Sequence, residues 1–230
     1  GTNVLCTLLV LQAMGISAFG LNCTSADLCP DIISEIAPYA KIPLIVKPSA
    51  VYEQDGEKQS ISPEEFAFAV KKSVLSGAEI AGGCCGTGKE HIAALREMFA
   101  SLDASEIDPV EKQDTSLALA TENQMFFLDP ETTEFSPAVE CGPYMEDDIA
   151  QMCGESYDVL TVSINSPDDA IDFGRNMHMA TLPVAFLSDD EISLKMALML
   201  YQGRAIIDRK SLIEPEKLEA MAEKYGAVLY

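Results

Sequence analysis

The sequence predicts an α/β protein in which short strands alternate with helices along most of the chain. Three observations support this fold class. First, residues 42–46 form a β-branched apolar run that stops at Pro48, as is typical of a buried strand. Second, Ser62, Pro63 and Glu65 form a helix-capping signature ahead of apolar residues at helical spacing. Third, this order of strand and helix repeats, and such a repeat indicates a parallel sheet.

The first part of the chain contains three strand–helix units. The strand at residues 17–21 runs into Asn22 and Cys23, and another very short strand runs into a glycine-rich segment with Cys84 and Cys85. A polar, glycine-containing loop is predicted at residues 49–60. Strands are predicted at residues 17–21, 42–46 and 79–81, and helices at residues 4–14, 31–39, 63–76 and 89–102.

A linker is predicted at residues 103–116, which are acidic and polar, contain Pro109 and lack an apolar period. The predicted domains are therefore residues 1–102 and residues 117–230, and the second is a partial βα domain. Its strands are predicted within residues 117–128 and at 159–164, 184–187, 205–207 and 228–230, and its helices at 139–153, 170–179, 192–201 and 215–225.

Composition restricts the partners of the protein. The net charge of −22 argues against nucleic acid and anionic membranes, which are bound mainly through Lys and Arg. No apolar run is long enough for a membrane span, and no basic segment precedes the apolar residues 4–10 as in a signal peptide. Seven cysteines are an odd number and favour reduced thiols or metal ligands. We expect a cytoplasmic protein.

Three cysteines are predicted to bind zinc. Cys23 follows one strand, and Cys84 and Cys85 follow another between glycines. The carboxyl ends of parallel strands share one edge of a sheet, so these thiols can converge. Three protein ligands and one open position form the pattern of a catalytic zinc site. The other cysteines, Cys6, Cys29, Cys141 and Cys153, are predicted to be core or surface thiols.

Two sequence strings point to a family. Residues 20–23 read Gly-Leu-Asn-Cys, and residues 82–87 read Gly-Gly-Cys-Cys-Gly-Thr, followed by Glu-His-Ile at residues 90–92. In this order the strings resemble the zinc-dependent homocysteine S-methyltransferases, in particular the homocysteine module of cobalamin-dependent methionine synthase. The resemblance implies a (β/α)₈ TIM-type barrel of which residues 1–102 are the C-terminal βα units. The sequence is therefore expected to be a fragment that is inactive alone.

The resemblance also implies an activity, methyl transfer to the thiol of homocysteine to give methionine, with no catalytic residue beyond the zinc ligands. One position departs from the family, because residues 48–51 read Pro-Ser-Ala-Val where the family has Pro-Asn-Ala-Gly, whose Asn can fill the fourth zinc position. The residues expected to contact the substrate are Asn22, Gly82, Gly83, Gly86 and Thr87.

The second half resembles the pterin-binding barrel that follows the homocysteine barrel in methionine synthases, through residues 182–184, 197–207 and 224–227. This resemblance implies methylcobalamin, on a separate corrinoid domain or protein, as the methyl donor. Folate itself is not expected to bind, because residues 187–189 and 208–210 replace the family's pterin contacts and residues 101–230 carry a net charge of −18. An open half-barrel is expected to form a homo-oligomer or to pack on the second domain.

The sequence is compatible with two other functions. The chain could be a non-catalytic remnant of a methionine synthase-like protein, serving assembly or zinc binding alone. It could also be a vicinal-dithiol redox protein, although adjacent cysteines lack the spacing of a thioredoxin-like motif. Zinc content distinguishes the methyltransferase from the redox protein, and homocysteine-dependent activity distinguishes it from the remnant.

Overall fold

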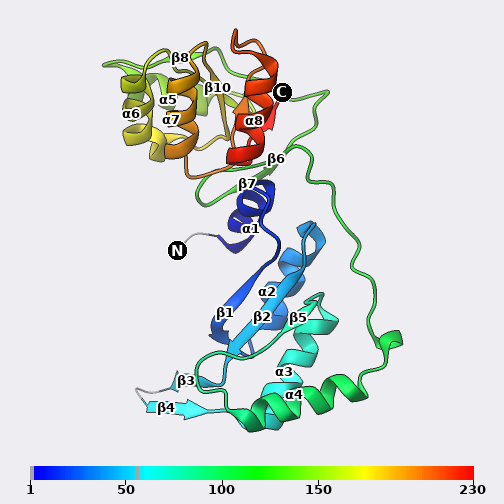
Figure 1. Ribbon diagram of the computed structural model, residues 1–230. Helices are drawn as coiled ribbons and strands as arrows, with labels where there is room; N and C mark the ends of the chain where they lie inside the picture. The colour runs from blue at the N-terminus through cyan, green and yellow to red at the C-terminus, as the bar shows by residue number, and fades with distance from the viewer. Residues whose placement is uncertain (1–2, 55–56) are drawn as a thin grey trace. The chain divides into compact units, whose positions relative to one another are not determined.

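The computed structural model describes residues 3–54 and 57–230, and contacts within the chain separate two compact units (Figure 1). Residues 16–113 form the cysteine unit, which contains Cys23, Cys84 and Cys85. Residues 1–15 and 114–230 form the C-terminal unit. Residues 1–2, and residues 55–56 of the predicted loop, lie outside the described residues.

The cysteine unit is built on a parallel sheet with strand order β1-β2-β5 among the described residues. Because the strands are parallel, their carboxyl ends lie at one edge, and β2 lies between the two strands that lead to the cysteines. The elements are β1 (Phe19–Ser25), α2 (Cys29–Ile36), a 3₁₀ turn (Ala37–Tyr39), β2 (Leu44–Ser49), β3 (Val51–Gln54), β4 (Glu57–Ser60), α3 (Pro63–Leu75), β5 (Ile80–Ala81), α4 (Lys89–Ser101) and a 3₁₀ turn (Ala104–Glu106).

The two faces of this sheet differ. Leu21, Leu44 and Val46 are buried on the face against which helices α2 and α3 pack. Asn22 and Lys47 alternate with these residues along their strands and are exposed. The predicted strand at residues 42–46 is therefore present, and within the described part of this unit helices cover one face of the sheet only.

The predicted loop at residues 49–60 is wrong in part, because β3 and β4 pair there as an antiparallel hairpin. Its strands are short and mostly polar, so no apolar alternation marked them in the sequence. The predicted cap of α3 is confirmed. Ser62 Oγ accepts from the Glu65 N–H at 3.2 Å, and the Glu65 carboxylate accepts from the Ser62 N–H at 2.9 Å.

The C-terminal unit contains a parallel sheet with strand order β12-β11-β10-β9-β8. Its predicted strands at residues 159–164, 184–187, 205–207 and 228–230 are confirmed, as is the helix at 215–225. The elements are β6 (Ala118–Ala120), β7 (Met125–Phe127), β8 (Val139–Glu140), α5 (Met145–Gly154), β9 (Leu160–Ser163), α6 (Pro167–Asn176), a 3₁₀ turn (Met177–Met179), β10 (Val184–Leu187), α7 (Glu191–Leu200), β11 (Ile206–Ile207), α8 (Pro215–Tyr225) and β12 (Val228–Leu229).

Two elements of the C-terminal unit differ from expectation. Residues 139–153 were predicted as one helix, but β8 occupies the first two positions and α5 begins only at Met145. Helix α1 (Val4–Ala13) was assigned to the first domain, whereas it groups with residues 114–230 and contacts β6. Leu5, Leu8 and Leu9 are buried there, because an apolar helix is stabilised by packing against other apolar side chains.

No helix in the described part of the chain has the length and apolar character that crossing a bilayer requires.

Arg204 is predicted to be a main stabilising residue of the C-terminal unit. Its guanidinium donates to the carbonyls of Thr115, Ala118 and Gly226 at 3.1, 2.6 and 3.0 Å. Arg204→Met removes these three hydrogen bonds to partly buried carbonyls, so we expect the free energy of unfolding to fall by about 2–4 kcal/mol in urea denaturation. Arg209→Met, which removes an exposed guanidinium from the same unit, is the control and should change it by less than about 0.5 kcal/mol. Equal effects would contradict this assignment.

Candidate metal centre

Cys23 lies in an irregular stretch of β1. The register with β2 shifts between Asn22 and Ser25, and Cys23 has φ +57, the single positive φ of a non-glycine residue among those described. A non-glycine residue in this left-handed region is uncommon, and strain of this kind concentrates at functional sites. A bulge of this type redirects a side chain at the end of a strand, and here the redirected side chain is the Cys23 thiol.

The turn that carries Cys84 and Cys85 is fastened to the end of β2 by backbone hydrogen bonds. The Cys84 N–H donates to the Pro48 carbonyl at 2.9 Å, and the Ala50 N–H donates to the Cys85 carbonyl at 2.8 Å. The Ser49 hydroxyl also lies 3.1 Å from the Cys85 carbonyl oxygen. The two cysteines are therefore positioned by the central strand of the sheet, although they follow β5.

Glycines make room within this turn. A Cβ atom at Gly83 would overlap the side chain of Thr87, whose hydroxyl donates to the Cys84 carbonyl at 2.6 Å. Gly86 has φ +76, and a Cβ atom there would overlap the side chain of Val51. Both glycines are thus required by the tight packing of the turn.

The three sulfurs converge. Cys85 Sγ lies 3.4 Å from Cys23 Sγ and 3.9 Å from Cys84 Sγ, and all three atoms lie within 4.8 Å of one another. Cys23 and Cys84 form a disulfide, with Cα atoms 5.5 Å apart, while Cys85 is free and exposed. We expected reduced thiols, whereas these two cysteines are paired in the structure, and their Cα separation is one that a disulfide can bridge.

In the reduced state this cluster fits a tetrahedral metal ion. Two sulfurs that bind the same zinc-sized ion at about 2.3 Å lie about 3.8 Å apart in tetrahedral geometry, which is close to the two distances from Cys85 Sγ. Among the described residues, this is the one group of Cys, His, Asp and Glu side chains that could hold a metal. A metal and the disulfide are alternative states of the same sulfurs, since the metal binds thiolates.

Other cysteines differ in their environment. Burial raises the pKa of Cys29 to about 11. Burial, reinforced by Asp169, Asp172 and Glu140, raises the pKa of Cys141 to about 12. These thiols stay protonated at neutral pH, which supports the prediction that they are not ligands.

The residues expected to contact the substrate lie in the two segments that carry the cysteines. The Asn22 side-chain amide donates to Cys23 Sγ at 3.6 Å, and Gly82 leads into the cysteine turn beside Gly83. The Thr87 hydroxyl donates to the Cys84 carbonyl, so the observed contact of Thr87 is with the cysteine turn. The substrate contacts of Asn22, Gly82, Gly83, Gly86 and Thr87 stay a prediction.

His91 has a structural position. Its Nδ1 accepts from the Gly88 N–H at 3.2 Å at the start of α4, and its Nε2 lies 3.3 Å from the Ile61 carbonyl oxygen, to which it can donate. His91 therefore caps the start of α4.

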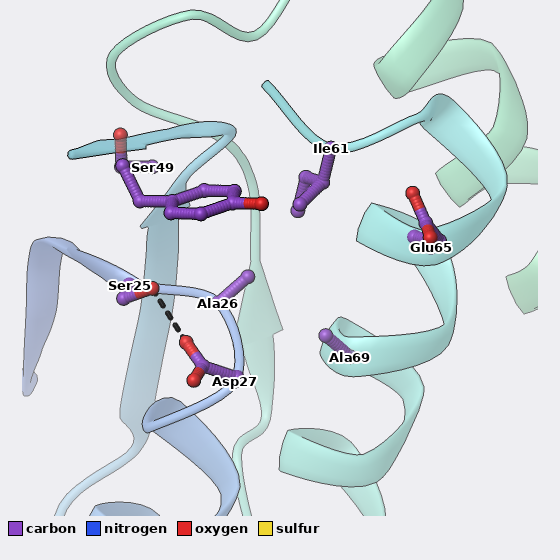
Figure 2. Close-up of a pocket in the computed structure, with 8 residues that line it drawn as sticks. Ser25, Ala26, Asp27, Ser49, Ile61, Glu65 and Ala69 are labelled. Carbon is purple, nitrogen blue, oxygen red and sulfur yellow. Dashed lines mark hydrogen bonds between the residues drawn. The ribbon is translucent and has the colours of Figure 1, made fainter. Parts of the chain in front are cut away.

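A cavity near this edge was not predicted (Figure 2). Its volume is about 360 Å³, and Ser25, Asp27, Tyr52 and Glu65 line it together with Ser49, which also contacts the cysteine turn. Among these lining residues, the Ser25 hydroxyl donates to the Asp27 carboxylate. These residues come from separate segments, so no sequence motif marked the cavity.

The C-terminal unit has a cavity of about 760 Å³ near the ends of β10, β11 and β12. Arg209 and Lys210 line it together with Asp208, so both signs of charge are present at this cavity. The net negative charge of residues 101–230 is therefore a weak argument against folate binding at this cavity. The prediction that folate does not bind depends mainly on residues 187–189 and 208–210, which replace the family's pterin contacts.

Comparison with known proteins bears on the N-terminal part of the chain. Residues 1–99 match the profile of the family described as homocysteine S-methyltransferase. This part of the chain is similar to that family. Three relatives are a methionine synthase of Mycobacterium leprae, 29% identical over 107 residues, a homocysteine S-methyltransferase of Bacillus subtilis, 30% identical over 91 residues, and a selenocysteine methyltransferase of Astragalus bisulcatus, 28% identical over 90 residues.

These matches are partial on both sides. They cover 44%, 38% and 36% of this chain, and 9%, 29% and 27% of the respective relatives. The chain thus spans less than a third of the length of each of these relatives. The profile nevertheless includes Cys23, Cys84 and Cys85, so the thiol cluster lies within the similar part.

Gly86→Ala is expected to weaken metal binding by the reduced protein, because a side chain at this left-handed position displaces Val51 and shifts the cysteine turn. We expect the affinity for a divalent metal, measured by competition with a chromophoric chelator, to fall at least tenfold. Gly142→Ala is the control, since a Cβ atom there has open space. Unchanged affinity in Gly86→Ala would contradict the packing argument.

Proposed function

We propose that this chain carries the zinc-binding part of a homocysteine S-methyltransferase of the methionine synthase type. The reaction is transfer of a methyl group to the thiol of homocysteine, which gives methionine. One observation carries the proposal, namely that three thiols converge within the residues that are similar to this family. Zinc suits the site because it binds thiolates tetrahedrally and three protein ligands leave one position for a substrate.

The residues of the chain have distinct parts in this proposal. Cys23, Cys84 and Cys85 would hold zinc, which when bound lowers the pKa of a coordinated thiol and so supplies a thiolate at neutral pH. Three anionic ligands preserve the nucleophilicity of that sulfur. The Asn22 amide, which donates to Cys23 Sγ, stabilises the thiolate form of this ligand. The Ala50 N–H, which donates to the Cys85 carbonyl, holds the cysteine turn at the end of β2.

The wider context is proposed from the resemblance to the family. Strands β1, β2 and β5 correspond to the last three strands of a (β/α)₈ barrel, whose loops at this edge form the active site. The methyl donor is a methylated corrinoid on a separate domain or protein. The reaction takes place in the cytoplasm, where thiols stay reduced.

Zinc content tests the metal site. Protein purified under reducing conditions without chelator is expected to contain about one zinc ion per chain by elemental analysis, because three thiolates and a fourth ligand complete its coordination. Cys84→Ala combined with Cys85→Ala should abolish this content, while Cys153→Ala, the control at a thiol outside the cluster, should preserve it. Zinc retained by the double variant would show that the site is elsewhere.

Homocysteine binding tests the function. Calorimetric titration of the reduced, zinc-loaded chain at pH 7 is expected to show release of about one proton per homocysteine bound, since a free thiol with pKa near 8.5 becomes a thiolate. Methionine, whose sulfur carries no proton, is the control and should release none. Zinc binding without any homocysteine binding would instead favour the non-catalytic remnant.

A further inference from the structure

Lys47 lies in the middle of the exposed face of the cysteine unit's sheet. It is in β2, and its register partner in β1 is Asn22, the residue before Cys23. On its other side is Gly82, two residues before Cys84, where a Cβ atom would lie 3.5 Å from Lys47 Cγ and 4.0 Å from its Cε. The side chain of Lys47 thus passes over a glycine, between the two segments that carry the thiols.

The ammonium group of Lys47 has no hydrogen bond or ion pair with any residue that the structure describes. Other lysines of the cysteine unit do have partners. Lys71 pairs with Glu106 at 2.8 Å, Lys72 lies over the ring of Phe68, and Lys112 donates to a backbone carbonyl. Lys47 is exposed and therefore available to an anionic ligand.

We infer that Lys47 binds the α-carboxylate of the thiol substrate and so selects amino acids over simple thiols. The inference rests on the proposed function, which places the substrate sulfur beside Cys23, Cys84 and Cys85. In homocysteine a short aliphatic chain joins the sulfur to the carboxylate, so a substrate held at the thiols has its carboxylate within reach of the neighbouring strand.

Charge supports this assignment. Three thiolates exceed the charge of one divalent ion, and a substrate thiolate adds to the excess, so the edge of the sheet repels a second anionic group unless a cation lies nearby. Lys47 supplies that cation from β2, the strand between the two ligand segments. A charge-assisted hydrogen bond from an ammonium to a carboxylate then favours substrates that carry this group.

The test compares two thiols on the reduced, zinc-loaded chain by calorimetry. Homocysteine carries the carboxylate, and aminopropanethiol keeps the thiol and the amino group but lacks it. Lys47→Met is expected to weaken homocysteine binding about tenfold and to leave aminopropanethiol binding unchanged. Lys47→Arg should restore most of the affinity for homocysteine. Lys89→Met, which removes a lysine whose side chain is 91% exposed, is the matched control and should change neither.

The outcomes separate this inference from the proposed function. If the wild-type chain binds neither thiol, the proposed function fails and the role of Lys47 fails with it. If wild-type protein and Lys47→Met bind homocysteine equally well, the function stands and the Lys47 assignment is wrong. Equal weakening of both thiols in Lys47→Met would indicate a disturbed metal site and would also overturn the assignment.

Discussion

The arrangement of the thiol cluster depends on the hydrogen bonds that fasten the Cys84–Cys85 turn to the end of β2. Strands β1 and β5 both pair with β2 and are not neighbours, so their cysteines can meet only across the end of the central strand. The hydrogen bonds from Cys84 to Pro48 and from Ala50 to Cys85 bring one partner there. The bulge at Cys23 brings the other.

The same constraint explains why the surrounding residues are small or polar. Gly83 and Gly86 lie where any side chain would collide with Thr87 or Val51, and the hydroxyls of Ser49 and Thr87 lie against the two cysteine carbonyls. Backbone groups in a turn need such partners once they are removed from water. The cluster is therefore supported by an ordered layer of hydrogen bonds, which keeps the sulfurs close before any ligand arrives.

Much of the fold could be predicted from local signals. The capping box at Ser62 and the helix at residues 215–225 are encoded by neighbouring residues, and the structure confirms them. The cysteines could be predicted as a cluster because adjacent thiols between glycines have little packing purpose. The pairing of residues 51–54 with 57–60 and the start of α5 could not be predicted, since polar strands and very short strands lack a periodic signal.

Other features of the site depend on contacts between distant segments. Three features arise from strand register, namely the left-handed conformation of Cys23, its pairing with Cys84, and the position of Lys47, whose ammonium has no partner among the described residues. Register cannot be read from one strand's sequence alone. A shift by one residue moves every side chain of the strand to the opposite face of the sheet, although the sequence of the strand is unchanged. The grouping of α1 with residues 114–230 likewise depends on tertiary contacts, because its apolar residues are buried against a segment more than 100 residues away in the sequence.

The short length of β5 bears on how readily the protein is degraded in a cell. This strand has two residues, and its only pairing in the described sheet is with β2, so the hydrogen bonds between the cysteine turn and the end of β2 supply most of the backbone pairing at this edge. An ion shared by Cys23 and Cys84 would close a loop across 61 residues and reduce the freedom of the unfolded chain. Metal supply would then govern proteolytic turnover, with chains that lack the ion opening more often at this edge and being degraded first.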